Sequence, residues 1–167
     1  MQDTRQPWLH RFDRWMYRGG RPNRLARILN RIGAIQYASG FAAPARAVTL
    51  EVTGRKTGQV ISLPLVLTQY HGERYLVSML GERANWVHNV HAAQGHAVLR
   101  HGYREPILLE DVEPGARAPI LRHYLELAPG ARGHFPVDRD APIADFQRIA
   151  AQYPVFHITP DSREPTA

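Results

Sequence analysis

The pattern of apolar and polar residues changes near residue 47 of this 167-residue chain. Before that point, apolar residues recur at helical spacing in segments 7–18 and 22–33, with arginines between them, which predicts two amphipathic helices. After it, short runs rich in β-branched residues are separated by glycine-containing turns, which predicts strands. We therefore expect a basic amphipathic helical arm over residues 1–45 and a separate folded unit over residues 46–167.

The second unit mixes strands and helices. The expected strands are 47–53, 59–69, 74–80, 96–101, 103–112 and 153–159, and the expected helices are 84–94, 114–128 and 140–152. The stretches TGRKTG and YHGE suit hairpin turns between the early strands. Pro64 lies inside the second strand, and since proline cannot donate a ladder hydrogen bond, we expect a bulge or an edge position there. These elements predict an α+β fold around a small antiparallel barrel, with peripheral helices.

Composition excludes several classes of protein. The chain is 44% hydrophobic and 22% charged, which is ordinary for a globular protein. It contains no cysteine, which excludes disulfides and thiolate metal sites. No stretch reaches the roughly 20 apolar residues that a membrane-spanning helix needs. The N-terminus lacks the apolar core of a secretory signal, so we expect a cytoplasmic protein.

The net charge of +6 belongs to the arm. Residues 1–31 hold eight arginines and two aspartates, while the rest of the chain balances basic and acidic residues. An arginine-rich amphipathic arm suits a membrane surface, so peripheral contact with anionic lipid through residues 5–31 is one interpretation. Packing of its apolar faces on the barrel is the other, and we favour it as the primary role. Because the barrel unit has no net charge, we do not expect nucleic-acid binding.

The turn TGRKTGQ, residues 53–59, contains Lys56, the only lysine in the chain. Gly54 and Gly58 suit a hairpin turn on conformational grounds alone. Glycines beside cationic side chains and free backbone N–H groups also form anion-binding sites. The turn is not a Walker loop, because its lysine lies between the glycines and no helix follows. Residue types leave a solvated turn and an anion site both open.

A second polar segment is SMLGERANWVHN, residues 78–89, where a strand passes through a glycine turn into a helix. A helix N-terminus presents free N–H groups that favour anions. Asn85, His88 and Asn89 share one helical face that suits a phosphate or a planar polar ring, although capping is an equal alternative for the asparagines. Trp86 lies on the other face, where core packing is the stronger interpretation. The nearby histidines have no carboxylate among them in sequence, so we expect no metal site.

In order, the stretches T-G-R-K-T-G, S-L-P-L, V-S-M-L-G and N-W-V-H-N resemble the deazaflavin-dependent nitroreductase family, also called nitroreductase/quinone reductase. That family comprises oxidoreductases with a split antiparallel β-barrel, similar to FMN-binding split barrels, that use coenzyme F-420, an 8-hydroxy-5-deazaflavin. The resemblance implies hydride transfer from the reduced coenzyme to a quinone- or nitroaromatic-like acceptor. FMN as the cofactor, or a barrel that binds coenzyme or lipid without catalysis, remain alternatives. Oligomeric state stays open, with a homodimer among the alternatives.

The resemblance also implies roles for particular residues. The expected coenzyme contacts are Arg55, Lys56, Thr57 and Gly58 at the phosphate and oligoglutamate tail, Pro64 and Leu65 near the ring, Ser78, Met79, Leu80 and Gly81 along the ring's edge, and Asn85, Trp86 and Asn89 at the ribityl-phosphate region.

Three residues are expected catalytic candidates: Tyr103, Tyr124 and His134. Tyr and His side chains can donate a hydrogen bond to a quinone or nitro oxygen and so polarise it. Core packing is the alternative for Tyr124. The 15-residue loop 128–142 carries His134 and Phe135, and we expect it to close over the ring.

Overall fold

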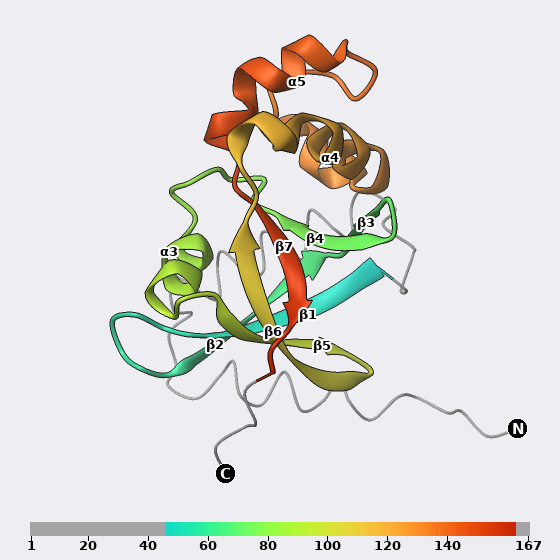
Figure 1. Ribbon diagram of the computed structural model, residues 1–167. Coiled ribbons are helices and arrows are strands. Elements are labelled where there is room, and N and C mark those ends of the chain that lie inside the picture. Colours follow the sequence, from blue (N-terminus) through green and yellow to red (C-terminus); the bar gives the residue numbers. More distant parts are fainter. Residues whose placement is uncertain (1–45, 163–167) are drawn as a thin grey trace, which may run out of the picture.

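The structure is a computed structural model that describes residues 46–162, so the expected N-terminal arm lies outside the described residues (Figure 1). Seven strands form one antiparallel sheet: β1 Ala47–Thr53, β2 Val60–Val66, β3 Thr68–Tyr70, β4 Glu73–Val77, β5 His96–His101, β6 Tyr103–Asp111 and β7 Val155–Pro160. The helices are α3 Asn85–Ala92, α4 Pro114–Leu127 and α5 Ile143–Ile149, with 3-10 turns η2 Pro129–His134 and η3 Ala150–Gln152. No helix among residues 46–162 is long and apolar enough to cross a membrane.

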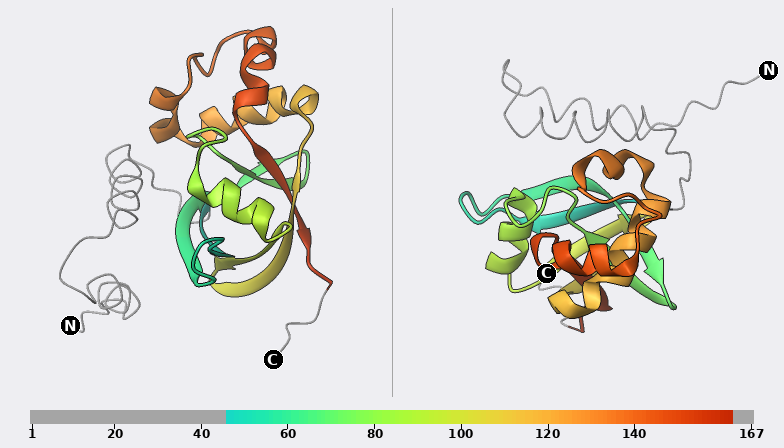
Figure 2. Two further views of the ribbon diagram at one scale, coloured as in Figure 1. Left: turned by 90° about the vertical axis from the view of Figure 1, so that its left-hand side faces the viewer. Right: turned by 90° about the horizontal axis from the view of Figure 1, so that it is seen from above.

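The sheet is curled into a split barrel, as expected, and one residue forces the curl. The strand order is β2-β1-β5-β6-β7-β4-β3, so β2 and β3 occupy opposite edges of the sheet. Only Leu67 separates them in the chain. Because neighbouring Cα atoms lie about 3.8 Å apart, the two edges must come together. The left-hand view of Figure 2 shows the resulting curvature of β1, β2, β5 and β6.

The expected strand 59–69 is therefore two strands. Its first part, β2, pairs with β1 from Thr53↔Val60 to Ala47↔Val66, and its second part, β3, pairs with β4. Between them the Leu67 N–H donates to Arg46 O at 2.8 Å. The residue pattern does not reveal this change of pairing partner, since both parts have the pattern of a strand. The expectation for Pro64 is confirmed, because β2 is an edge strand.

Two hydrophobic cores lie on either side of the sheet. The first fills the barrel: inward residues of the strands, among them Leu50, Leu99 and Ile107, pack with Trp86 and Val90 of α3. The second joins α4, α5, η2 and η3 to the strand ends at Val77 and Val155. Figure 1 shows α4 and α5 above the barrel and α3 beside it. Helix α3 therefore belongs to the barrel, whereas the other helices form a separate layer.

Arg117 ties this helical layer to the sheet. Its side chain is buried and donates to the carbonyl oxygens of Val112, Ala150, Ala151 and Tyr153 at 2.7 to 3.4 Å. Burial lowers the pKa of the guanidinium, although nearby Asp111 and Glu82 oppose the shift. The four carbonyls belong to the end of β6 and to the turn after α5, so one side chain holds α4 in place against both.

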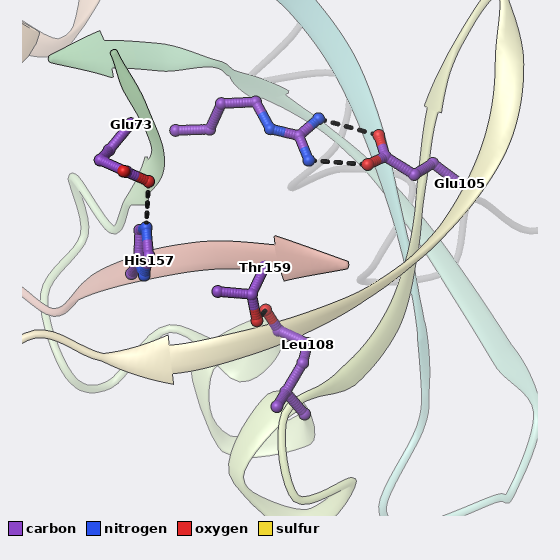
Figure 3. Close-up of polar contacts among 6 residues, drawn as sticks. Glu73, Glu105, Leu108, His157 and Thr159 are labelled. Carbon is purple, nitrogen blue, oxygen red and sulfur yellow. Dashed lines mark hydrogen bonds and ion pairs between the residues drawn. The ribbon is translucent and has the colours of Figure 1, made fainter. Parts of the chain in front are cut away.

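Arg74 and Glu105 close the lower part of the barrel from inside. Two hydrogen bonds, at 2.7 and 2.8 Å, join the Arg74 guanidinium to the Glu105 carboxylate, drawn as paired dashed lines at Glu105 in Figure 3. They bridge β4 and β6, which are separated by β7 in the sheet. The hydrogen bond from Arg74 lowers the pKa of Glu105, against a smaller opposing effect of burial. In the same figure, His157 of β7 pairs with Glu73 at 2.8 Å.

Candidate functional site

The cationic turn between β1 and β2 is closed by its own backbone. The Gly54 N–H donates to Gln59 O at 2.7 Å and the Gly58 N–H donates to Gly54 O at 2.8 Å. Gly58 has a φ of +68°, a backbone conformation that residues with a side chain rarely adopt. A Cβ on Gly54 would lie 2.8 Å from Ile61 Cδ1. The Thr57 hydroxyl accepts the Gln59 N–H at 3.3 Å. Both glycines are therefore explained by the turn itself.

Arg55 joins this turn to helix α3. Its backbone N–H and its Nη1 both donate to Asn89 Oδ1, at 3.2 and 3.0 Å. Nη1 also lies 3.4 Å from Asn85 O, and Nη2 lies 3.5 Å from Asn85 Oδ1. The cationic turn and helix α3, which both carry expected coenzyme contacts, are therefore in direct contact. Arg55 and Asn89 are 34 residues apart, and no local sequence signal links them.

Lys56 is exposed, and no described residue forms a hydrogen bond or ion pair with its amino group. The backbone N–H groups of Lys56 and Thr57 also have no described acceptor. A cation and two free N–H groups at one exposed turn are the donors that a phosphate or carboxylate requires. In this respect Lys56 differs from its neighbour Arg55, whose guanidinium already has partners.

The connection from β4 to α3 is a tight turn. The Ser78 hydroxyl donates to Gly81 O at 2.8 Å, and the Gly81 N–H donates to Ser78 O at 3.1 Å. Gly81 has φ of +75°, and a Cβ there would lie 2.9 Å from Gln152 O of η3. Met79 is half-buried and Leu80 is 45% exposed, so this turn presents apolar surface beside backbone groups. The backbone N–H groups of Asn85 and Trp86, which start the helix, have no described acceptor.

Three of the expected coenzyme contacts differ in their position relative to the barrel core. Trp86 is 8% exposed and packs in the barrel core, with its ring centroid 5.4 Å from that of Phe156. Leu65 packs against the same core, and Pro64, the preceding residue in β2, therefore faces the other side of the sheet. The roles assigned to these residues stay predictions, and a ring on one side of β2 meets only one of the two side chains.

The three catalytic candidates do not gather in one place. Tyr103 starts β6 at the β5–β6 hairpin and is 64% exposed. Tyr124 and His134 lie in the helical layer, at the other end of the molecule in Figures 1 and 2. Tyr124 is 4% exposed, and burial raises the pKa of its phenol well above the usual range. Core packing, the alternative interpretation of Tyr124, describes its position.

The loop 128–142 is anchored rather than free-standing. It begins with η2, and Phe135 is buried with its ring stacked on Tyr153 at a centroid distance of 4.1 Å. The Tyr153 hydroxyl donates to His134 O at 2.8 Å. Tyr153 was expected only as the first residue of the strand 153–159, so its contact with the loop was missed. Closure of this loop over a ring stays a prediction, and closure would break the contacts with Tyr153.

The comparison that decides the family concerns most of the chain. The family model described as "F420H(2)-dependent quinone reductase" matches residues 28–144. The chain belongs to this family. Membership makes it an oxidoreductase that depends on coenzyme F-420, and between the two cofactors left open by the sequence it selects the deazaflavin rather than FMN. No sequence relative was found among curated proteins.

Solved structures similar to this F-420-dependent oxidoreductase are distant in sequence. An F420-H2 dependent reductase (FDR-A) is 20% identical with a TM-score of 0.47, and the match covers 68% of this chain and 94% of that one. A structure described as a domain-swapped dimer is 16% identical with a TM-score of 0.50, covering 79% and 96%. The conserved hypothetical protein Rv2991 from Mycobacterium tuberculosis is 15% identical with a TM-score of 0.49, covering 79% and 80%. At such identities the likeness concerns the fold alone.

The residues at the turn and at α3 fit the acidic part of coenzyme F-420. A phosphate and a carboxylate-bearing tail need fixed donors and positive charge. The donors that have no described acceptor are the Lys56 amino group and the backbone N–H groups of Lys56, Thr57, Asn85 and Trp86. Arg55 hydrogen-bonds to Asn85 and Asn89, so it links the turn to the helix that carries the other donors. No carboxylate of a described residue pairs with Arg55 or Lys56 to neutralise that surface.

Proposed function

We propose that this protein transfers a hydride from reduced coenzyme F-420 to a quinone- or nitroaromatic-like acceptor. The observation that carries the proposal is the direct contact between the cationic turn and α3 through Arg55 and Asn89. Together with membership in the "F420H(2)-dependent quinone reductase" family, it supports binding of an elongated acidic coenzyme along this surface.

The chemistry belongs to the coenzyme, which when bound supplies the hydride from its ring carbon. The acceptor gains this hydride together with one proton, so that a quinone becomes a quinol. The protein's residues then have three tasks: to bind the acidic tail, to orient the ring and to exclude water. Lys56 and the neighbouring N–H groups carry out the first task, and the turn Ser78–Gly81 carries out the second through its fixed backbone.

We propose solvent as the source of the proton. Ser78 is buried and its hydroxyl is engaged with Gly81 O. Tyr124 lies in the second core, and the hairpin that carries Tyr103 lies at the far end of the sheet from the turn before α3. Tyr103 is therefore poorly placed to reach an acceptor next to residues 78–81, and burial in the second core encloses the Tyr124 phenol. His134, at the end of η2, is half-buried, and a role for it as a hydrogen-bond donor to the acceptor stays a prediction.

Incubation of the purified full chain with reduced coenzyme and a menaquinone analogue tests the proposal, with a nitroaromatic compound as a second acceptor. We expect oxidation of the coenzyme above the rate without protein, with formation of one quinol per coenzyme. Tight binding of the coenzyme with no oxidation by any of several acceptors would select a non-enzymatic carrier instead. A protein that does not bind the coenzyme at all would refute the assignment of the surface.

A further inference from the structure

Arg55 and Lys56 are adjacent cations, but the structure gives them different surroundings. Arg55 donates to two asparagines of α3, whereas the amino group of Lys56 has no described partner. We infer that the two residues divide the work at the site: Arg55, with Asn89, is a positioning pair that fixes the turn on the helix, and Lys56 contacts the acidic part of the coenzyme. The second half of this inference rests on the proposed function; the first half does not.

Asn89 is suited to hold the turn because its side chain is buried and fixed by packing. It is 3% exposed and lies in the middle of α3, between Val87 and Val90 of the barrel core. Its single Oδ1 accepts both the Arg55 backbone N–H and the Arg55 Nη1. Two donors from one residue on one acceptor fix both the backbone and the side chain of Arg55. Hydrogen bonds that involve a charged group are also the stronger ones.

Lys56 is held on both sides while its own amino group stays free. On one side the Arg55 N–H is bound to Asn89, and on the other the Gly58 N–H is bound to Gly54 O. Because the backbone of the turn is already ordered, less conformational entropy of the turn is lost when an anion binds to Lys56. The compact ammonium of Lys56, on its flexible side chain, suits the several carboxylates of an oligoglutamate tail. The Arg55 guanidinium is already bonded to α3, so it has fewer N–H donors left for the coenzyme.

The single lysine of the chain provides a test of the positioning pair without any coenzyme. An endoproteinase that cleaves only after lysine can cut the chain at one place, giving fragments 1–56 and 57–167. We expect slow cleavage of the wild-type protein and cleavage about tenfold faster in Arg55→Gln and in Asn89→Ala, since each loses a charge-assisted hydrogen bond that restrains the turn. Asn89→Asp keeps an oxygen at the same position, and we expect it to be cleaved as slowly as the wild type.

Arg122→Gln is the matched control, because Arg122 is exposed on α4 and has no described partner. It should be cleaved at the wild-type rate. Since Arg55 is exposed, its replacement should also leave the melting temperature within about 2 °C of the wild-type value. Equal cleavage rates in the wild type, Arg55→Gln and Asn89→Ala would overturn the positioning role.

Calorimetric titration with oxidised coenzyme F-420 tests the division of work. Arg55→Lys keeps the charge and removes the planar fork; if Arg55 positions the turn, affinity falls about tenfold. The salt dependence of binding should remain that of the wild type, because the charge is retained. Lys56→Gln should weaken binding and also flatten its salt dependence. Arg122→Lys, the control, should bind like the wild type.

Wild-type affinity in Arg55→Lys, or wild-type salt dependence in Lys56→Gln, would overturn the assigned roles. Failure of the proposed function gives a different result. If the wild-type protein does not bind the coenzyme, the protease should still separate Asn89→Ala from Asn89→Asp. The positioning pair would then stand, and the coenzyme contact of Lys56 would be refuted.

Discussion

Replacement of Gly81 by alanine tests how closely the turn before α3 is fitted to the helical layer. Gly81 has φ of +75°, and a Cβ at this position would lie 2.9 Å from Gln152 O. Real Cβ atoms do not approach a backbone oxygen so closely, so either the turn or η3 must shift. Because Gly81 also exchanges hydrogen bonds with Ser78, a shift would disturb the segment that we propose orients the coenzyme ring.

Gly72 provides a matched control for the backbone effect. It has φ of +80°, and a Cβ there would meet nothing within 4 Å. Alanine with positive φ costs about 1 kcal/mol, so we expect Gly72→Ala to lower the free energy of unfolding by about that amount. Gly81→Ala carries the same backbone cost and adds the contact with Gln152 O, for a total of about 2 to 3 kcal/mol.

Thermal melting of both variants in the absence of coenzyme measures the difference. With about 2 to 4 °C per kcal/mol for a chain of this size, Gly72→Ala should melt roughly 3 °C below the wild type and Gly81→Ala roughly 6 °C or more below it. Coenzyme affinity should fall in Gly81→Ala and not in Gly72→Ala. Equal melting temperatures in the two variants would refute the close approach of Gly81 to η3, and unchanged affinity in Gly81→Ala would refute the role of this turn at the ring.

Three further variants test other parts of the structure. The hydrogen bond from Arg74 lowers the pKa of Glu105, so this pairing stabilises the protein above the unfolded-state pKa and is lost as the pH falls through the folded-state value. Glu105→Gln should therefore lower the free energy of unfolding by about 1 kcal/mol at neutral pH. In urea unfolding it should lose less stability than the wild type as the pH falls below about 5. Arg117→Met leaves four carbonyls without their buried donor and should lower the free energy of unfolding by about 3 kcal/mol, while a loss below 1 kcal/mol would show that water replaces it. Tyr124→Phe should change kcat with a menaquinone analogue by less than about twofold, because the phenol is buried in the second core; a large fall in kcat with unchanged melting temperature would restore Tyr124 as a catalytic residue.

Much of the fold follows from local patterns. Alternating residues over 47–53 and 96–101 predict strands with the observed bounds, and Pro114 marks the start of α4 as expected. The turn chemistry of residues 53–58 also predicts the first hairpin. These features are readable because each depends on the backbone conformations and side-chain periodicity of a few neighbouring residues.

The candidate site was predictable in its residue types but not in its contacts. The sequence predicts that a cationic turn and the asparagines of α3 are both suited to an anion, and family resemblance brings them together. The sequence does not predict that Arg55 has a hydrogen-bond partner and Lys56 has none, because that difference depends on Asn89, 34 residues away from Arg55. The sequence offers core packing for Tyr124 and not for Tyr103, and only the structure decides that Tyr124 is buried.

The sequence by itself determined the kinds of element, the cationic residue types of the turn and the confinement of net charge to residues 1–31. Only the tertiary structure decided that one residue, Leu67, joins the two edges of the sheet, and that the Arg55 guanidinium is bonded to α3 while the Lys56 amino group has no described partner. The reason is physical: conformational preference acts between neighbours in the chain, whereas burial and hydrogen-bond partners are set by segments that meet only when the barrel closes.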